Sequence, residues 1–141
     1  MKRFALATLA VLMTPLMALA QSATMYRSPY CGCCLGHAEY LRQQGYDVQV
    51  IELEPEALAY MKAEHTIPER QQGCHTLMIE GYVVEGHVPV EAIEKLLAER
   101  PDIAGITLPG MPAGSPGMGG TKSEPFTVLV IGEGDEVFAV I

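Results

Sequence analysis

Tryptophan is absent from the 141-residue sequence, and aromatic residues make up only 6% of it. Basic residues are also few: 9 Lys and Arg stand against 17 Asp and Glu, for a formal net charge of -8. Nucleic-acid-binding proteins need a basic face to neutralise phosphates, and many use aromatic side chains to stack on bases. The composition therefore argues against nucleic-acid binding. The length suits one modest domain and is too short for two ordinary ones.

A long apolar run stands at the start of the sequence. Met1-Lys2-Arg3 is a short basic segment, residues 4–19 are apolar apart from two Thr and one Pro, and small residues end the run at Ala18 and Ala20. This is the pattern of a secretory signal peptide with its cleavage site, and the run is short for a membrane span. We expect residues 1–20 to be a cleaved signal that exports the chain to a bacterial periplasm, with no membrane attachment afterwards. A retained membrane anchor is the alternative.

Short apolar runs alternate with helical patterns through the next part of the chain. Pro55 and Pro89 stand at the first turns of two expected helices, Gly45 follows the end of another, and Glu80-Gly81 predicts a hairpin turn. The expected strands are residues 24–26, 48–53, 76–79 and 82–85, and the expected helices are residues 33–44, 55–65 and 89–98. The order β-α-β-α-β-β-α predicts an α/β protein of the thioredoxin-like class, with a four-stranded sheet covered by helices on both faces.

The C-terminal part of the chain has a different character. Residues 108–120 hold three Pro, five Gly and two Met, which predicts a loop without a core of its own. Residues 126–131 and 137–141 are β-rich and predict a hairpin. We therefore expect a thioredoxin-like domain over residues 21–107 and a C-terminal extension over residues 108–141 that packs on the same domain.

Three of the four cysteines fall within four residues at the start of an expected helix. Cys31, Cys33 and Cys34 combine a C-x-C with a C-x-x-C pattern. The free N–H groups and the dipole of a helix N-terminus stabilise thiolates. Three soft anions within one turn suit Cu(I) and other thiophilic ions, whereas a structural zinc site usually joins two separated ligand pairs. The cluster therefore indicates sulfur chemistry and favours metal binding.

Two interpretations without metal stay open at this point. Cys31 and Cys34 have the spacing of a redox-active disulfide, with Cys33 as a bystander, and Cys74 can be an inert buried thiol or a structural disulfide partner. Cys33 favours the metal interpretation, because a simple dithiol exchanger gains nothing from a third adjacent thiol. A disulfide between the neighbours Cys33 and Cys34 would be strained.

Other candidate ligands lie farther along the chain. Cys74-His75 precedes an expected strand at the place where thioredoxin-like proteins usually carry a cis-proline facing the cysteine motif, so both side chains are candidate ligands. For His75, a role in handling protons or in shaping the loop is the alternative. Met111 and Met118 are thioethers on the Pro/Gly-rich loop, and thioethers prefer Cu(I). His87 lies at a strand end, where turn or capping use competes with coordination. His37 lies one turn beyond the cysteines, close enough to line the site, but we expect it to be exposed to solvent. We expect His65 to be a solvated residue at a helix end.

Four motifs in order resemble the CopG-type periplasmic copper-resistance proteins. They are Ser28-Pro29-x-Cys31-Gly32-Cys33-Cys34, Gly73-Cys74-His75-Thr76, residues 80–89 (Glu-Gly-Tyr-Val-Val-Glu-Gly-His-Val-Pro) and residues 109–118 (Pro-Gly-Met-Pro-x-Gly-Ser-Pro-Gly-Met). The resemblance implies copper held in a multinuclear cluster bridged by cysteine sulfurs. It implies metal ligands at Cys31, Cys33, Cys34 and Cys74, with His75, His87, Met111 and Met118 as further ligands. His37 departs from the pattern, because an aromatic residue such as Trp is expected there.

These observations lead to three hypotheses. The first is a periplasmic copper-binding protein of copper homeostasis, expected to be a monomer, that interconverts Cu(I) and Cu(II) ahead of an efflux system. Whether it is an enzyme, as a copper oxidoreductase, stays open. The second is a thioredoxin-like thiol–disulfide oxidoreductase that needs no metal. The third is a copper chaperone that passes Cu(I) to an efflux partner without redox change.

Overall fold

The computed structural model describes residues 20–141, so the expected signal peptide lies outside the described residues except for its last one. Within this range the chain forms three α-helices, one 3-10 turn and seven strands. Their bounds in chain order are β1 (Ser22–Arg27), α1 (Gly32–Gln43), β2 (Asp47–Glu52), α2 (Pro55–Glu64), η1 (Glu69–Gln71), β3 (His75–Ile79), β4 (Tyr82–Glu85), α3 (Val90–Glu99), β5 (Gly105–Thr107), β6 (Thr127–Val130) and β7 (Val137–Val140).

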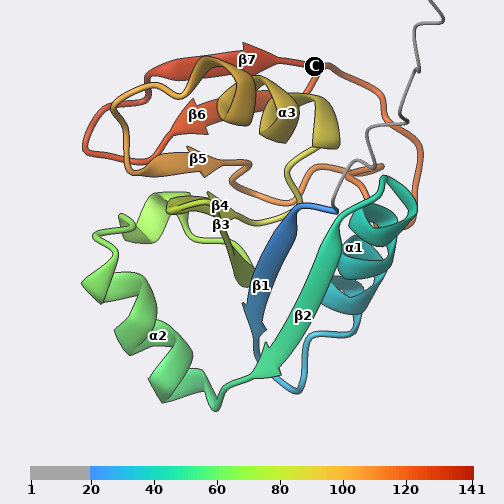
Figure 1. Cartoon of the computed structure of the whole chain (residues 1–141), viewed down its shortest axis with the longest axis vertical. Helices are drawn as coiled ribbons and strands as arrows, with labels where there is room; N and C mark the ends of the chain where they lie inside the picture. Colours follow the sequence, from blue (N-terminus) through green and yellow to red (C-terminus); the bar gives the residue numbers. More distant parts are fainter. Residues whose placement is uncertain (1–19) are drawn as a thin grey trace, which may run out of the picture.

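The described strands form one sheet in the order β2-β1-β3-β4-β5-β6-β7 (Figure 1). β1 pairs in parallel with β2, and it pairs antiparallel with β3, which is itself antiparallel to β4. These four strands with α1, α2 and α3 give the predicted β-α-β-α-β-β-α arrangement, and the thioredoxin-like prediction is confirmed. The sheet then continues through β5, parallel to β4, into the antiparallel strands β6 and β7.

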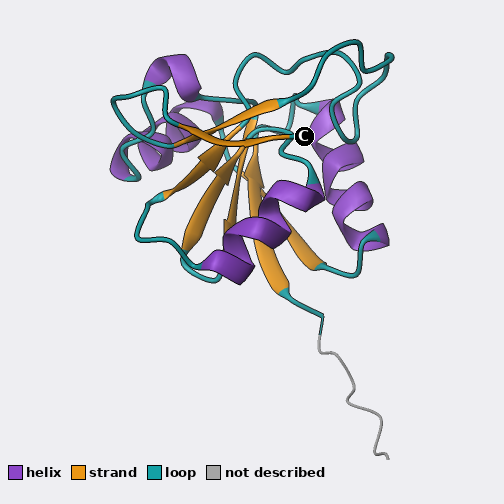
Figure 2. Ribbon diagram, turned by 90° about the horizontal axis from the view of Figure 1, so that it is seen from above, coloured by secondary structure: helices purple, strands orange, loops and turns teal. Residues whose placement is uncertain are grey.

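The helices cover both faces of this sheet. α1 and α3 lie on one side of it, and α2 lies on the other (Figure 2). The main hydrophobic core forms on the first side, where Cys34, Ala38 and Leu41 of α1 pack with the buried face of α3 and with alternate residues of the strands, such as Met25 and Leu77. A smaller cluster of Ile67, Val83 and Ile131 forms apart from that core.

The C-terminal hairpin belongs to the same packed body. β6 pairs with β5, and Phe126 and Val128 enter the main core. β5 was not expected from the sequence, because Gly105–Thr107 is only three residues long and follows an irregular connection. Gly105 lies so close to β4 that an added Cβ would come within 1.9 Å of the Val83 carbonyl oxygen. Only a glycine fits at this point of the β4–β5 pairing.

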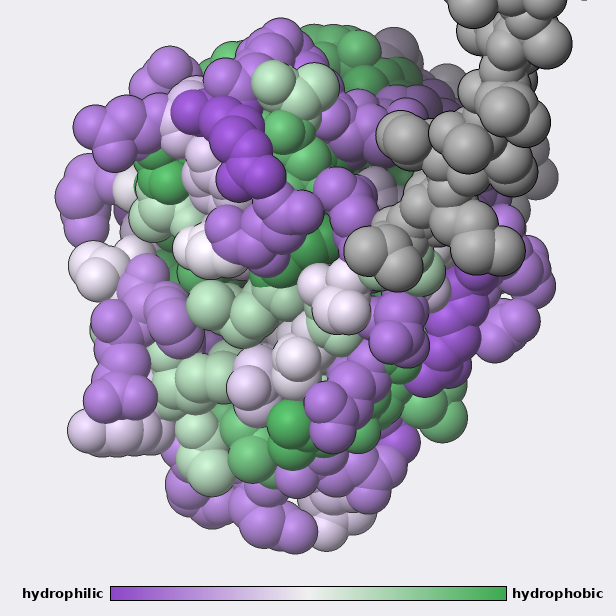
Figure 3. Space-filling model, in the orientation of Figure 1, coloured by the Kyte–Doolittle hydropathy of each residue, from purple (hydrophilic) through white to green (hydrophobic). Residues whose placement is uncertain are grey.

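Figure 3 shows hydrophilic residues around the margin of the face seen in Figure 1, with a paler, more apolar strip across its middle. Among the helices of residues 20–141, none has both the length and the apolar character needed to cross a bilayer.

Candidate metal centre

The cysteine motif begins where β1 ends and α1 starts. Arg27, the last residue of β1, is 5% exposed, and its guanidinium donates hydrogen bonds to the carbonyl oxygens of Ser28 and Cys31 at 3.0 and 2.8 Å. The same guanidinium pairs with the Glu52 carboxylate of β2. Cys31 is the N-cap residue of α1, and no side chain caps this helix end. The first turn therefore leaves its backbone N–H groups beside the cysteine sulfurs.

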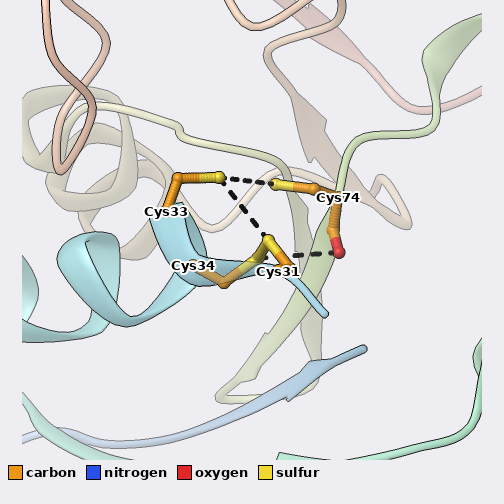
Figure 4. A group of neighbouring side chains, drawn as sticks. All are labelled: Cys31, Cys33, Cys34 and Cys74. Carbon is orange, nitrogen blue, oxygen red and sulfur yellow. Dashed lines mark hydrogen bonds between the residues drawn. A yellow bond between two sulfur atoms is a disulfide. The ribbon is translucent and has the colours of Figure 1, made fainter. Parts of the chain in front are cut away.

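Four sulfur atoms meet at this helix end (Figure 4). Cys31 and Cys34 form a disulfide, and Cys33 and Cys74 are free thiols. The Cys33 Sγ lies 3.5 Å from the Cys31 Sγ and 4.0 Å from the Cys74 Sγ. The structure thus brings the distant Cys74 to the other three cysteines, as the sequence led us to expect. Cys31 and Cys34 become thiolate donors only when their disulfide is reduced.

A buried ion pair fixes the segment that carries Cys74. The Glu85 carboxylate at the end of β4 is fully buried, and it accepts hydrogen bonds from the Gly73 N–H at 2.7 Å and from the Thr76 hydroxyl at 2.6 Å. Lys62 of α2 pairs with this carboxylate and donates to the Gly73 carbonyl oxygen at 2.9 Å. Both polar groups of Gly73 are therefore held, one residue before Cys74.

Two glycines let the Cys74 segment approach the loop that carries His87. A Cβ added at Gly73 would lie 2.7 Å from the Gly86 Cα, and Gly86 itself has a φ of +78°. A larger residue at position 73 would push the two segments apart. This close approach places His87 beside Cys74.

Two imidazoles face the Cys74 sulfur. The His87 Nε2 lies 3.2 Å from the Cys74 Sγ, and the His75 Nδ1 lies 3.4 Å from it. His87, His75 and Cys34 form with Cys74 a second group whose donor atoms all lie within 4.8 Å of one another. Cys34 and Cys74 belong to both groups, so the sulfur and imidazole donors form one continuous centre.

Backbone carbonyls decide which ring nitrogens carry hydrogen. The His87 Nδ1 lies 2.8 Å from the Pro116 carbonyl oxygen, which can only accept, so Nδ1 carries the hydrogen in the neutral ring. The His87 Nε2 then presents a lone pair to Cys74. His75 Nε2 lies 2.8 Å from the Nδ1 of a third histidine, His37. These three rings lie in mutual contact, with centroids 4.8 to 5.1 Å apart.

Burial keeps these groups uncharged in the metal-free protein. Burial lowers the pKa of His37 to about 4 and the pKa of His75 well below its usual value, and it also lowers the pKa of His87. Burial, aided by the neighbouring Cys33, raises the pKa of the Cys74 thiol to about 12. At neutral pH the centre therefore holds neutral imidazoles and a protonated Cys74 thiol.

The donor set fits a soft or borderline metal ion. Thiolate sulfur and imidazole nitrogen are the preferred ligands of copper and zinc, whereas magnesium and calcium prefer oxygen. A Cys74 thiol carries one hydrogen and cannot satisfy two imidazole lone pairs at once. A cation in place of this hydrogen would be held by the Cys74 sulfur together with the ring nitrogens of His75 and His87. The residues present therefore fit copper, and its binding would release a proton from Cys74.

The structure brings some of the expected ligands together more clearly than others. The four cysteines, His75 and His87 converge. Met111 is 39% exposed, with a φ of +45°. Met118 is half-buried and directly follows Gly117, whose backbone touches α1. Ligation by either methionine stays a prediction.

The prediction that His37 is exposed is wrong, because His37 is fully buried. It lies three residues after Cys34 on the same stripe of α1 that Ala38 and Leu41 extend. That spacing could have revealed its inward direction, which the polarity of histidine obscured. His65 ends α2 as its C-cap residue and is half-buried rather than fully exposed. Sequence reasoning also missed Lys62 and Glu85, because charged residues are rarely buried.

Comparisons with known proteins agree with this geometry. A family model described as "Protein of unknown function, DUF411" matches residues 71–118. The chain is similar to two solved structures of the copper resistance protein CopG, form 1 and form 2, with 33% sequence identity and TM-scores of 0.76 and 0.75. Each match covers 86% of this chain and 98% of the other. No curated protein matches the sequence.

Proposed function

This chain belongs to the family of the copper resistance protein CopG, and from that premise we propose that it binds copper through its cysteine cluster in copper homeostasis. One observation carries the proposal: four sulfur atoms and two imidazole nitrogens converge at the start of α1. Copper is the ion that the relative's name and this donor set have in common.

The proposed ligands come from the start of α1, the start of β3 and two loops. The four Sγ atoms lie within 4.8 Å of one another, so metal ions held among them would share sulfur ligands, which supports a multinuclear cluster. We assign the cluster to Cys31, Cys33, Cys34 and Cys74, with His75 and His87 beside Cys74. Met111 and Met118 are proposed to add thioether ligands from the loop that lies against α1.

The same cysteines provide electrons for copper reduction. When the reduced Cys31 and Cys34 form their S–S bond, two protons and two electrons leave the pair, and the electrons reduce two Cu(II) ions to two Cu(I) ions. Cys33 and Cys74 keep their sulfurs free to hold the Cu(I) that forms. Regeneration of the dithiol needs an external thiol or another two-electron reductant.

Anaerobic copper loading tests the binding proposal. The reduced protein is expected to hold several Cu(I) equivalents per chain, measured by metal analysis after removal of free copper. The triple variant Cys31→Ser, Cys33→Ser, Cys34→Ser is expected to lose them together. Less than one equivalent in the reduced wild-type protein would overturn the proposal.

Addition of Cu(II) to the reduced protein without oxygen tests the redox step. Two Cu(I) ions are expected for each pair of thiols lost, with four free thiols falling to two. The Cys31→Ser variant cannot form the disulfide and serves as the control. Copper bound as Cu(II) with all four thiols intact would argue for binding without redox change, as in a chaperone.

A second function is favoured by the Cys31–Cys34 disulfide at the start of α1. This is the arrangement of a thiol–disulfide oxidoreductase that needs no metal. Reduction of insulin that survives both Cys33→Ser and a strong copper chelator would support this activity. Inertness in the same assay would remove it.

The cellular setting follows from the sequence pattern. We propose that the chain is exported to the periplasm and hands copper to an efflux system. Cell fractionation with a C-terminal tag tests the location, and mass spectrometry of the purified protein tests cleavage after Ala20.

A further inference from the structure

The buried His37 has no place in the ligand set, yet it contacts the ring of His75. We propose that His37 is a positioning residue, which holds His75 in the tautomer whose Nδ1 lone pair faces Cys74 and the bound copper. This inference rests on the proposed function for the role of His75 as a ligand. The tautomer itself is a property of the metal-free protein and is independent of copper.

The chain of hydrogen bonds begins at a backbone carbonyl. The His37 Nε2 lies 3.0 Å from the Val88 carbonyl oxygen, which can only accept a hydrogen bond. In the neutral His37 ring, Nε2 therefore carries the hydrogen and Nδ1 has the lone pair. Val88 follows His87, so the carbonyl that orients His37 belongs to the same loop as a proposed ligand.

The hydrogen bond between His37 and His75 then fixes the tautomer of His75. The His37 Nδ1 and the His75 Nε2 are 2.8 Å apart, and the bond exists only when the His75 Nε2 carries its hydrogen. The His75 Nδ1 is then left with a lone pair, 3.4 Å from the Cys74 Sγ. The alternative tautomer of His75 would place two lone pairs against each other between two fully buried side chains. No solvent reaches these atoms to replace the lost bond.

The two proposed histidine ligands thus use opposite ring nitrogens. The Pro116 carbonyl oxygen fixes His87 with its Nε2 toward Cys74, whereas His37 fixes His75 with its Nδ1 toward Cys74. Groups that accept a hydrogen bond from the far nitrogen of a metal-binding histidine set its tautomer and orientation. In this chain, a histidine performs that task for His75.

A matched pair of substitutions tests His37. His37→Asn places a carbonyl oxygen near the position of the Nδ1, where it accepts the hydrogen bond from the His75 Nε2. His37→Leu has the same number of side-chain heavy atoms and the same branching as the Asn variant, and it accepts no hydrogen bond. Both variants lose the ring bond to Val88, so their difference isolates the bond to His75.

The first readout is the tautomer of His75 in metal-free protein. Long-range proton–nitrogen NMR spectra of the imidazole rings distinguish hydrogen at Nε2 from hydrogen at Nδ1. The wild-type and Asn proteins are expected to carry it at Nε2, and the Leu variant is expected to lose this single form. Retention of the Nε2 form by the Leu variant would overturn the proposal, whether or not the protein binds copper.

The second readout is Cu(I) affinity of the reduced protein, measured by competition with a chromophoric chelator. Loss of such a partner weakens metal binding by about 10- to 100-fold. We expect the Cu(I) affinity of the His37→Leu variant to be lower than that of the His37→Asn variant by a factor in this range. Equal affinities of the two variants would contradict the role. Thermal unfolding checks that both variants fold, and a wild-type protein that binds no copper would refute the proposed function and leave the tautomer result standing.

Discussion

At the scale of single residues, the fold controls the protonation of the Cys74 thiol. Cys74 is held among buried groups, and burial together with the nearby Cys33 thiol raises its pKa to about 12. Thiolate is the reactive form of cysteine, so a raised pKa slows reaction with alkylating agents. Cys74 is therefore a free thiol that reacts slowly as long as it carries its proton.

The rate at which Cys74 is alkylated tests its raised pKa. At pH 8, iodoacetamide is expected to modify Cys74 in the folded, metal-free protein on the order of a hundredfold more slowly than in the urea-unfolded protein. Peptide mapping by mass spectrometry measures both rates. Cys33→Ser should speed the folded-state reaction, because the neighbouring thiol is the second cause of the shift. Equal rates in folded and unfolded protein would show that Cys74 titrates as an ordinary thiol.

At the scale of elements, α2 contributes to the centre from the far side of the sheet. Its Lys62 is 4% exposed and pairs with the fully buried Glu85. Removing one partner of a buried ion pair leaves a charge without compensation and costs about 3 to 5 kcal/mol. Lys62→Met is therefore expected to lower the free energy of unfolding by that amount in urea titrations.

A half-exposed pair provides the control for Lys62. Lys95 and Glu99 of α3 lie 3.8 Å apart, with side chains 41% and 55% exposed. Glu99→Gln removes one charge of this pair and leaves the contacts of Lys95 with Phe138 in place, and a loss within about 1 kcal/mol is expected. A similar loss in both variants would contradict the special role of the buried pair.

The crossing of α1 by the C-terminal loop gives a second prediction at this scale. A Cβ at Gly117 would come within 2.2 Å of the His37 backbone nitrogen, and Gly117 has a φ of +75°. Gly117→Ala is expected to displace the loop, break the Pro116–His87 bond and destabilise the protein by about 1 to 3 kcal/mol. Gly119→Ala meets open space and should change stability by less than about 0.5 kcal/mol. Thermal unfolding compares the two variants, and equal melting temperatures would refute the close contact.

The elements themselves were well predicted from the sequence. Pro55, Gly45 and the Glu80-Gly81 turn marked boundaries that lie within a few residues of the observed ones. β5 was missed, because three residues carry no readable alternation and its pairing with β4 depends on the Val83 backbone. A local pattern predicts elements, and it does not show which strand a short segment joins.

The centre was predicted less completely than the fold. The cysteine spacing gave the sulfur cluster, and the convergence of Cys74 with it follows from the pairing of β1 with β3, which places Arg27 opposite His75. The inward direction of His37 and the burial of Lys62 with Glu85 were not predicted. The helical spacing of His37 from Cys34 and Leu41 did carry a sign of its direction. Lys62 and Glu85 are 23 residues apart, so sequence neighbours carry no sign of their pairing.

At the scale of the whole molecule, buried neutral histidines make stability depend on pH. Burial lowers the pKa of His37 to about 4 from a usual value of 6.5. The unfolded chain therefore binds more protons than the folded one below pH 6.5, so folding stability rises with pH in this range. The contribution of the neutral, buried His37 ring to folding stability is fully present above pH 6.5 and is lost as the pH falls towards 4.

Urea titrations of the metal-free protein between pH 7 and pH 4 check this dependence. The free energy of unfolding is expected to fall by on the order of 1 kcal/mol per pH unit for His37 alone, with His75 adding to the slope. His37→Leu removes one of these groups and should flatten the curve. An unchanged slope in this variant would contradict the buried neutral state.

The two backbone carbonyls of Val88 and Pro116 also bear on how tightly the proposed centre would bind an ion. The Pro116 carbonyl oxygen fixes the ring of His87, and the Val88 carbonyl oxygen fixes that of His75 through His37. For these proposed ligands the entropy of orienting the rings would then be lost during folding and not on ion binding. Affinity then depends on the rigidity of the loops around positions 88 and 116. Substitutions that loosen this scaffold weaken binding even where every ligand is left in place.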